Sequence, residues 1–272
     1  MKFKVAVVQF EINHLKPAEN LKKAEQFIKK ASGRSDIIVF PEDFITGPIK
    51  YDQSFADSNK KYLEIFTNLA KNYQIDIVPG TIIEKQNNGL FNNTYYIDKF
   101  GKVKGYYHKI NLWLSEKSYI QSGNKLSVFN TEFGKVGLII CWDLVNPLII
   151  RNMAKIGVKI IFCPSYWSIL DDKIGQKYDP EYEIKHVNGL CQARAFENNV
   201  ILIYCNGVGE VLGGRKKGFI LGRSQITTPF KGAVKRLDHG KEEMFIETLD
   251  TNILKDAEIV YKIRKDIHYG IF

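Results

Sequence analysis

Short runs of apolar, mostly β-branched residues recur along the chain and predict its buried strands. They span residues 4–10, 37–40, 75–78, 136–141, 158–163 and 200–205. Strands that read as continuous apolar runs are typical of sheets covered on both faces. We therefore expect these segments to form the interior of an α/β sheet structure.

Segments with helical periodicity alternate with these runs. Pro17 can open a helix at its first turn, and a second helix is predicted from Tyr62 to Tyr73. The apolar residues of the two segments recur at three- and four-residue steps, as on one face of a helix: Ala18, Leu21, Ala24, Phe27, Ile28 and Ala31 in the first, and Tyr62, Ile65, Phe66, Leu69, Ala70 and Tyr73 in the second. Two further helices are expected near 146–156 and 180–198.

From Thr81 the pattern changes to strands joined by turns. Asn87-Asn88-Gly89 is typical of a hairpin turn, and residues 99–102 form a turn between two predicted strands. The strands expected in this style are 93–98, 103–109, 126–130, 219–227, 233–237 and 244–248. No internal repeat, low-complexity tract or linker interrupts the chain. The sequence therefore predicts one α/β domain over residues 1–272, with a mixed sheet extended by hairpins at one edge.

Composition and charge narrow the class of protein. The chain has 272 residues, of which 44% are apolar and 25% charged, which is enough for a large core. The net charge of +9 comes from lysines and arginines spread along the chain, so it indicates a solvated surface and not a nucleic-acid site. No run approaches the roughly 18 apolar residues of a membrane helix, and no signal peptide opens the chain. We expect a cytoplasmic protein that binds neither nucleic acid nor membrane.

The cysteines supply a candidate nucleophile. The four cysteines lack CxxC spacing, which argues against a disulfide framework or a zinc site. Cys141 is expected to close the apolar strand 136–141, and α/β ligand sites lie at the carboxyl ends of strands. Trp142-Asp143 and Asn146-Pro147 predict a tight turn into a helix, as in a nucleophile elbow. The alternative is that Cys141 is a core residue.

A thiol nucleophile requires a base. Of the five histidines, only His108 has a supporting pattern, since it stands at the end of a strand beside Lys109. Period-two alternation sends those two side chains to opposite faces, without indicating which of them faces the site. Glu42 follows the strand 37–40 and could act as a base or solvate a loop.

Three blocks of this sequence resemble the catalytic signatures of the nitrilase (carbon–nitrogen hydrolase) superfamily. Supporting blocks run over nearly the whole chain, from the first strand to the segment 222–229. The three catalytic blocks, in order, are Pro41-Glu42-x-Phe44-x-Thr46-Gly47, His108-Lys109-x-x-Leu112 and Gly137-x-x-Ile140-Cys141-Trp142-Asp143. The resemblance implies a four-layer αββα sandwich that pairs into a homodimer through helices.

The resemblance also implies roles for individual residues. Glu42 would be the base that takes the proton of Cys141, so histidine is unnecessary. Lys109, with the backbone N–H of Trp142, would stabilise the oxyanion and would favour thiolate character on the sulfur. Glu116 would orient Lys109 or the substrate, with a surface or capping role as the alternative. The chemistry implies no metal and no organic cofactor.

The substrate is the least determined part of this prediction. Trp113, Tyr166 and Trp167 are candidates to line the substrate pocket, and packing at an interface is the alternative. Asp143 is similar to the amidase pattern, whereas Trp142 also occurs in true nitrilases. Leu148 departs from the family, in which an acidic residue is common. A small linear amide of the ω-amide type is favoured, with N-carbamoyl compounds or nitriles as alternatives, and a catalytically inactive binding module as the non-enzyme alternative.

Overall fold

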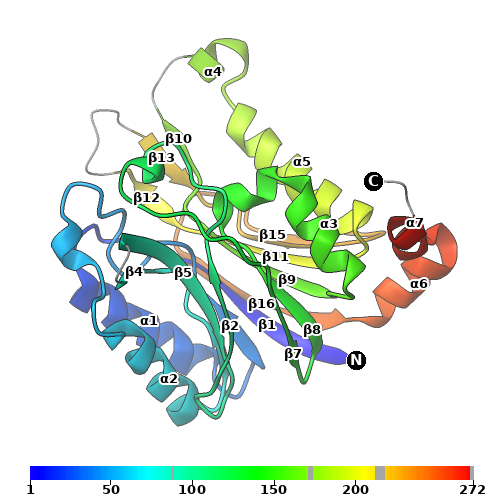
Figure 1. Ribbon diagram of the computed structural model, residues 1–272, viewed down its shortest axis with the longest axis horizontal. Helices are drawn as coiled ribbons and strands as arrows, with labels where there is room; N and C mark the ends of the chain where they lie inside the picture. Colours follow the sequence, from blue (N-terminus) through cyan, green and yellow to red (C-terminus); the bar gives the residue numbers. More distant parts are fainter. Residues whose placement is uncertain (87–88, 171–173, 212–217, 270–272) are drawn as a thin grey trace.

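The computed structural model of the protein describes residues 1–86, 89–170, 174–211 and 218–269. Its first large sheet has seven strands in the order β16-β1-β2-β3-β5-β4, with β6 paired to β5 (Figure 1). These strands are β1 (Lys2–Gln9), β2 (Ile37–Val39), β3 (Asp76–Val78), β4 (Ile82–Gln86), β5 (Gly89–Ile97), β6 (Val103–His108) and β16 (Glu243–Asp250). The β4, β5 and β6 hairpins extend one edge of this sheet, as the turn pattern predicted. Residues 87–88 of the predicted turn lie outside the described residues.

The second large sheet has six strands in the order β15-β14-β11-β9-β8-β7. They are β7 (Ser127–Thr131), β8 (Gly134–Leu138), β9 (Ile160–Ser165), β11 (Ile201–Asn206), β14 (Gln225–Thr228) and β15 (Gly232–Arg236). Its centre is parallel, since β9 pairs in parallel with both β8 and β11. A small three-stranded sheet is formed by β10 (Ser168–Leu170), β12 (Val208–Glu210) and β13 (Gly218–Leu221).

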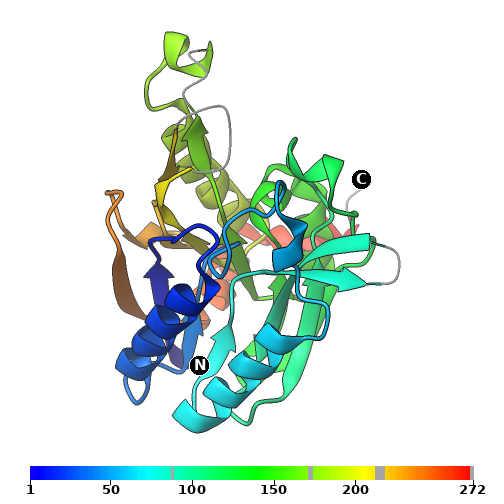
Figure 2. The ribbon, with the colours of Figure 1, turned by 90° about the vertical axis from the view of Figure 1, so that its left-hand side faces the viewer.

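Helices cover the outer faces of both large sheets. Figure 1 shows α1 and α2 on one side and α3 and α5 on the other, while α4 lies at the far end of the molecule in Figures 1 and 2. The helices are α1 (Pro17–Ala31), α2 (Lys61–Tyr73), α3 (Pro147–Lys155), α4 (Ile174–Tyr178), α5 (Tyr182–Glu197), α6 (Asn252–Tyr261) and α7 (Ile263–Tyr269), with 3₁₀ turns η1 (Gln53–Phe55), η2 (Glu116–Ser118) and η3 (Cys141–Val145). Pro17 and Pro147 each stand at a helix start, where a missing N–H costs nothing.

Alternate residues of β1 belong to two different cores. Val5 and Val7 pack between the sheets in a cluster that continues to α3 and α5, whereas Ala6 and Val8 pack with residues of α1 and α2. A strand covered by a sheet on one face and by helices on the other must be apolar at every position. The layers are therefore helix, sheet, sheet and helix, which confirms the predicted αββα sandwich.

The structure corrects the prediction at two strands and adds elements that were missed. β8 ends at Leu138, so Cys141 does not close the strand and instead begins η3. The predicted strand 219–227 is two strands in different sheets, because Gly222 and Arg223 both have positive φ (66° and 62°) and turn the chain. Helices α6 and α7, with the short strands β10 and β12, were not predicted. Among the described residues, no helix is long and apolar enough to cross a membrane.

Candidate active site

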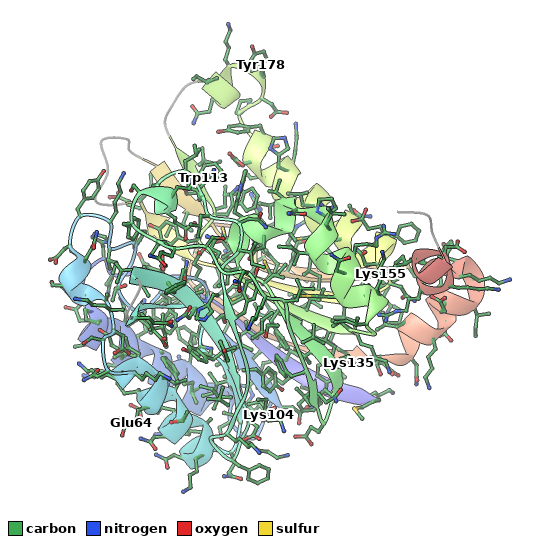
Figure 3. The ribbon with its side chains drawn as sticks, viewed as in Figure 1. Glu64, Lys104, Trp113, Lys135, Lys155 and Tyr178 are labelled. Carbon is green, nitrogen blue, oxygen red and sulfur yellow. The ribbon has the colours of Figure 1, made fainter. Side chains whose placement is uncertain are left out.

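Glu42, Lys109, Glu116 and Cys141 come together where strands from both large sheets end. Glu42 follows β2, Lys109 follows β6, and Cys141 lies three residues after β8. All four side chains are buried. In Figure 3, Trp113, four residues after Lys109, lies toward the α4 end of the molecule, and Lys104 and Lys135 lie toward the opposite end.

Lys109 lies between two carboxylates. Its Nζ is 2.7 Å from Glu42 Oε1 and 2.6 Å from Glu116 Oε2, and the side chain is only 1% exposed. Burial alone would lower the pKa of Lys109, but the two carboxylates outweigh it and raise that pKa well above its ordinary value. Lys109 is thus held as an ammonium ion. Between His108 and Lys109, it is Lys109 that faces the site, while the His108 ring contacts Asn93.

Glu42 accepts hydrogen bonds on both of its oxygens. Oε2 accepts from the Tyr166 N–H at 2.8 Å, and Oε1 accepts from Lys109 and from Asn92 Nδ2, the latter at 2.8 Å. Burial raises the pKa of Glu42, and Lys109 opposes that rise. A carboxylate whose pKa is raised is a stronger base than an exposed glutamate. The alternative in which Glu42 solvates a loop does not apply, because the side chain is buried.

Cys141 is turned toward Glu42 by its backbone. Its φ of 45° lies in the left-handed region, which is strained for a residue with a side chain and typical of a nucleophile elbow. Burial, with the Glu42 charge in addition, raises the pKa of the Cys141 thiol well above its ordinary value, although Lys109 opposes this. Lys109 therefore favours the thiolate, as expected, but in the resting site burial and the neighbouring carboxylate outweigh this effect on the pKa of the thiol. The sulfur carries its proton until a base removes it.

Asp143 fixes the turn that carries Cys141. Its carboxylate is fully buried and accepts from the Ile140 N–H at 2.9 Å, from the Tyr107 hydroxyl at 2.9 Å, and from the N–H and Nδ2 of Asn111 at 2.8 and 2.9 Å. One side chain thus ties the elbow to the segment that follows Lys109.

Asn92 was not identified from the sequence, yet it contacts both carboxylates. Its Nδ2 donates to Glu42 Oε1 at 2.8 Å and to Glu116 Oε1 at 3.0 Å, and the side chain is 1% exposed. The backbone N–H of Lys109 donates to Asn92 O at 2.9 Å. The available signal was an asparagine inside a strand, where that residue type is depleted.

Replacing Asn92 with alanine is expected to lower kcat/KM about 10- to 100-fold. This range corresponds to the energy of the lost hydrogen bonds, because hydrogen bonds to charged groups are stronger than those between neutral groups. The adjacent Asn93→Ala is the matched control, because Asn93 Nδ2 donates to Glu84, outside the four-residue site. Steady-state kinetics on both variants measures the difference. Equal losses in the two would show that Asn92 acts only on the stability of β5.

Replacing Lys109 with methionine is expected to lower the free energy of unfolding by about 3–5 kcal/mol at pH 8, because two buried carboxylates lose their counter-charge. Without Lys109 the folded-state pKa of Glu42 rises further above its unfolded value. Below the unfolded pKa the carboxyl is protonated in both states and costs no stability. The loss of stability should therefore grow as pH rises from the unfolded pKa to the folded pKa of Glu42, and it should shrink in acid.

Urea unfolding at several pH values measures this dependence. Lys104→Met is the matched control, since Lys104 is an exposed residue of β6, the strand that Lys109 follows. A loss in Lys109→Met that is the same at pH 4 and pH 8 would assign the effect to packing instead of charge.

Three tryptophans lie beside the nucleophile. The ring centroids of Trp113 and Trp142 are 4.2 Å apart, and those of Trp142 and Trp167 are 5.3 Å apart. The backbone N–H of Trp113 donates to Glu116 Oε2 at 2.7 Å. Tyr166, whose backbone N–H donates to Glu42, is partly buried against the core that contains Ala6 and Val8, and burial raises the pKa of its hydroxyl. All the predicted pocket residues are thus near the four-residue site.

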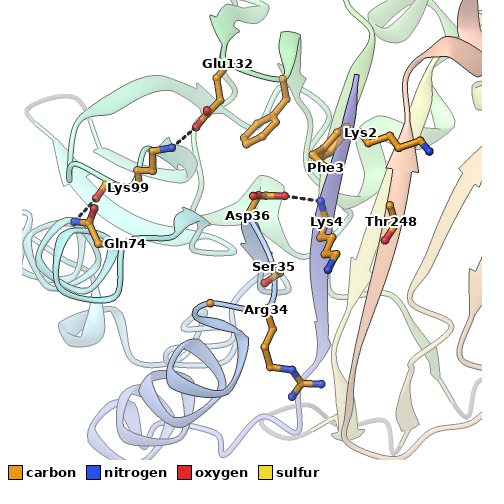
Figure 4. A pocket seen from close by; sticks show the side chains of 12 residues that line it. Lys2, Phe3, Lys4, Arg34, Ser35, Asp36, Gln74, Lys99, Glu132 and Thr248 are labelled. Carbon is orange, nitrogen blue, oxygen red and sulfur yellow. Dashed lines mark hydrogen bonds and ion pairs between the residues drawn. The ribbon is translucent and has the colours of Figure 1, made fainter.

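A hollow of about 420 Å³ lies elsewhere, at the start of β1 (Figure 4). It is lined by residues such as Lys4, Asp36, Lys99 and Glu132 and contains none of the four site residues. Two contacts lie within its lining: Lys99 pairs with Glu132 at 2.9 Å, and Asp36 accepts from the backbone N–H of Lys4 at 2.7 Å. This hollow is separate from the chemistry at Cys141. Among the described residues, no three His, Cys, Asp or Glu side chains are grouped to hold a metal ion.

Comparison with known proteins identifies related sequences over the whole length. Residues 4–258 match the family model described as Carbon-nitrogen hydrolase. The chain is 29% identical to 2-oxoglutaramate amidase of Bacillus subtilis over 98% of this chain and 100% of that protein. It is 26% identical to N-carbamoylputrescine amidase of Oryza sativa, over 97% of this chain and 91% of that one.

Solved structures of the same fold include a carbon–nitrogen hydrolase from Helicobacter pylori, with a TM-score of 0.87 at 19% identity, covering 98% of this chain and 95% of that one. An amidase from Nesterenkonia, in a form with acrylamide added to its active-site cysteine, has a TM-score of 0.79 at 21% identity, covering 96% of this chain and 99% of that one.

Proposed function

Because the chain belongs to the carbon–nitrogen hydrolase family and is a hydrolase of that class, we propose that it cleaves a small linear amide with Cys141 as nucleophile, Glu42 as base and Lys109 as the oxyanion cation. The observation that carries this proposal is the contact of one buried ammonium with two buried carboxylates beside the thiol. Glu42 is a buried carboxylate with a raised pKa, and a base that takes the proton of a neutral thiol needs that property.

The first half-reaction forms a thioester. Glu42 takes the thiol proton as Cys141 Sγ attacks the amide carbon, so a C–S bond forms and the carbonyl oxygen becomes an oxyanion. Lys109 and the backbone N–H of Trp142 stabilise that oxyanion. Protonated Glu42 then gives its proton to the leaving nitrogen, the C–N bond breaks, and ammonia departs.

The second half-reaction restores the thiol. Glu42, again a carboxylate, takes a proton from water as the water oxygen attacks the thioester carbon. The C–S bond breaks, the sulfur regains its proton, and a carboxylic acid is released. The raised pKa of Glu42 suits this repeated exchange of one proton.

Glu116 is proposed as a positioning residue. Its Oε2 contacts both Lys109 Nζ and the backbone N–H of Trp113, at 2.6 and 2.7 Å. This arrangement keeps the ammonium beside Glu42 and leaves Glu42 as the carboxylate that also approaches the sulfur.

A terminal carboxamide of the ω-amide type is the favoured substrate, with Trp113, Tyr166 and Trp167 around its acyl part. An amidase of this kind is named among the relatives, and an N-carbamoyl amidase is named as well. A screen for ammonia release across short amides, ω-amides, N-carbamoyl amines and nitriles tests the proposal. Release confined to nitriles, with no amide turned over, would contradict the amidase assignment.

Alkylation of the thiols provides a second test. Iodoacetamide is expected to label Cys141 faster than Cys163, Cys191 or Cys205, because Cys141 is 6% exposed and has Glu42 beside it, whereas the other three are 0% exposed. Mass spectrometry of a time course measures the four rates. Equal rates at all four would argue against an activated and accessible Cys141.

We further propose a homodimer in the cytoplasm. All four cysteines are free and buried, as suits a reducing compartment. Phe196, Phe230 and Tyr261 form an aromatic cluster in which each residue is more than 40% exposed, and the centroids of the two phenylalanine rings lie 5.2 and 5.5 Å from that of Tyr261. Burying such a cluster against a second copy would remove apolar area from water. A monomeric mass by light scattering would contradict the dimer.

A further inference from the structure

Asp43 and Thr81 meet where two neighbouring strands end. β2 and β3 run in parallel, with Val39 opposite Val78, so the chain leaves both strands at the same edge of the sheet. Glu42 and Asp43 follow β2, and Thr81 lies between β3 and β4. Asp43 and Thr81 are both buried, at 7% and 1% exposure. The residue directly after the proposed base is therefore packed against the segment that follows the next strand.

Two hydrogen bonds join Asp43 to Thr81. The backbone N–H of Asp43 donates to Thr81 Oγ1 at 3.0 Å, and Thr81 Oγ1 donates to Asp43 Oδ1 at 3.3 Å. One hydroxyl thus holds both the main chain and the side chain of the residue next to Glu42. A valine at position 81 would have nearly the same shape but could make neither bond.

The backbone around Asp43 has a conformation that depends on its contacts. The φ of Asp43 is 54°, in the left-handed region that residues other than glycine seldom adopt and that asparagine and aspartate adopt most readily. The Gly47 N–H donates to the Asp43 carbonyl at 2.6 Å and closes the turn. Gly80 lets the two segments touch, since a Cβ there would collide with the Pro41 carbonyl oxygen. The position of Glu42 is therefore set in part by its neighbours.

Asp43 stands outside the ion pairs of the site. In the part of the chain that the structure describes, Lys109 pairs with Glu42 and Glu116, and no ion pair involves Asp43. Burial, with the charges of Glu42 and Glu116 in addition, raises the pKa of Asp43 well above its ordinary value. An uncharged Asp43 can still accept the bond from Thr81, so the contacts of this pair do not require a charge.

We propose that the Asp43–Thr81 pair positions Glu42 for taking the thiol proton, and that it acts through its hydrogen bonds. This inference rests on the proposed amidase function and deepens it by adding two positioning residues to the base. The backbone N–H of Glu42 donates to the Ser165 carbonyl at 3.3 Å, a long bond. The Asp43–Thr81 pair adds a second restraint on the main chain there, and misplacing a reacting group by about 1 Å can lower a rate about 100-fold.

Two substitutions at position 81 separate the hydroxyl from the packing of the side chain. Thr81→Val keeps the shape and removes both bonds, so kcat for ammonia release should fall about 10- to 100-fold with little change in KM. Thr81→Ser keeps the hydroxyl and removes the methyl group, so it should regain most of the kcat lost in Thr81→Val. Steady-state kinetics measures both variants. A wild-type kcat in Thr81→Val, or an equal loss in the two variants, would overturn the proposal.

Thr94→Val is the matched control. Thr94 is also buried, and its hydroxyl has no hydrogen-bond partner among the residues that the structure describes. The same substitution there should leave kcat unchanged, because no hydrogen bond is lost. If Thr94→Val loses as much kcat as Thr81→Val, the effect belongs to any change in the core and the positioning role is refuted.

Asp43→Asn tests whether the pair depends on charge. Asparagine tolerates the left-handed φ and keeps a side-chain oxygen that can accept from Thr81. The acid limb of kcat/KM, which reports Glu42, should therefore lie at the same pH in this variant as in the wild type. A charged Asp43 would raise the pKa of Glu42, so removing that charge would move the acid limb to lower pH. Such a shift would overturn an action through hydrogen bonds.

Labelling of Cys141 gives a measurement that needs no substrate. Alkylation also requires loss of the thiol proton, so iodoacetamide should label Cys141 more slowly in Thr81→Val than in the wild type, and Thr81→Ser should restore the rate. Mass spectrometry of a time course measures the rates, and equal rates in all three proteins would overturn the proposal. The expected order of rates without ammonia release from any amide would instead count against the amidase function.

Discussion

Cys141→Ala protein is expected to release no ammonia from any amide that the wild type hydrolyses, a loss of at least about 10⁴-fold in kcat. The reason is chemical: without the sulfur no thioester forms, and the remaining groups can only assist direct attack by water. Stability should change much less, because Cys141 lies at the edge of the core and loses one buried sulfur. Steady-state ammonia release and urea unfolding measure the two effects separately.

Cys191→Ala is the matched control for this variant. Cys191 is a fully buried thiol in α5, so its removal creates a small cavity without touching the four-residue site. It should keep its turnover while losing some stability. Retained activity in Cys141→Ala would contradict covalent catalysis and leave Glu42 and Lys109 as groups that activate water directly.

The parts of the fold predicted correctly depend on local patterns. The buried strands could be read from their apolar runs, and α1 and α2 from helical periodicity, because each pattern reflects which faces an element covers. The prediction of a single strand over 219–227 was wrong for the same reason. Its residues are suited to a strand throughout, and only the turn at Gly222 and Arg223 sends the two halves to different sheets.

The candidate site was predictable where a motif marks it and not where contacts are long-range. Glu42, Lys109 and Cys141 stand in recognisable blocks. Asn92 lies 50 residues from Glu42 in sequence and has no local pattern that points to a carboxylate.

The protonation state of Cys141 was also beyond sequence reasoning. A nearby lysine suggested a thiolate, but the balance depends on how deeply the sulfur is buried and on which carboxylate is nearest. In the folded protein burial and Glu42 both raise the pKa of the thiol, and Lys109 acts mainly on the carboxylates. A neutral thiol cannot attack until a base removes its proton. We therefore expect a large loss of kcat when Glu42 is replaced.

Glu42→Gln is expected to lower kcat about 10²- to 10⁴-fold, the range for loss of a general base. Glutamine has nearly the same shape as Glu42, but its single acceptor oxygen can keep either the bonds from Lys109 and Asn92 or the bond from the Tyr166 N–H, so part of the loss will come from the changed contact. In the wild type, kcat/KM should fall in acid as Glu42 is protonated, at a pH above that of an ordinary glutamate because its pKa is raised. That acid limb should be absent from the residual activity of the variant.

The comparison that isolates the base is Glu84→Gln. Glu84 is also a buried glutamate, 3% exposed, but it accepts from Asn93 and Tyr95 on the hairpin side of the sheet. Its replacement should cost stability and leave the acid limb in place. If Glu42→Gln keeps both its rate and the acid limb, another group takes the thiol proton. His108 would not be that group, because its ring points to Asn93 while Lys109 faces the sulfur.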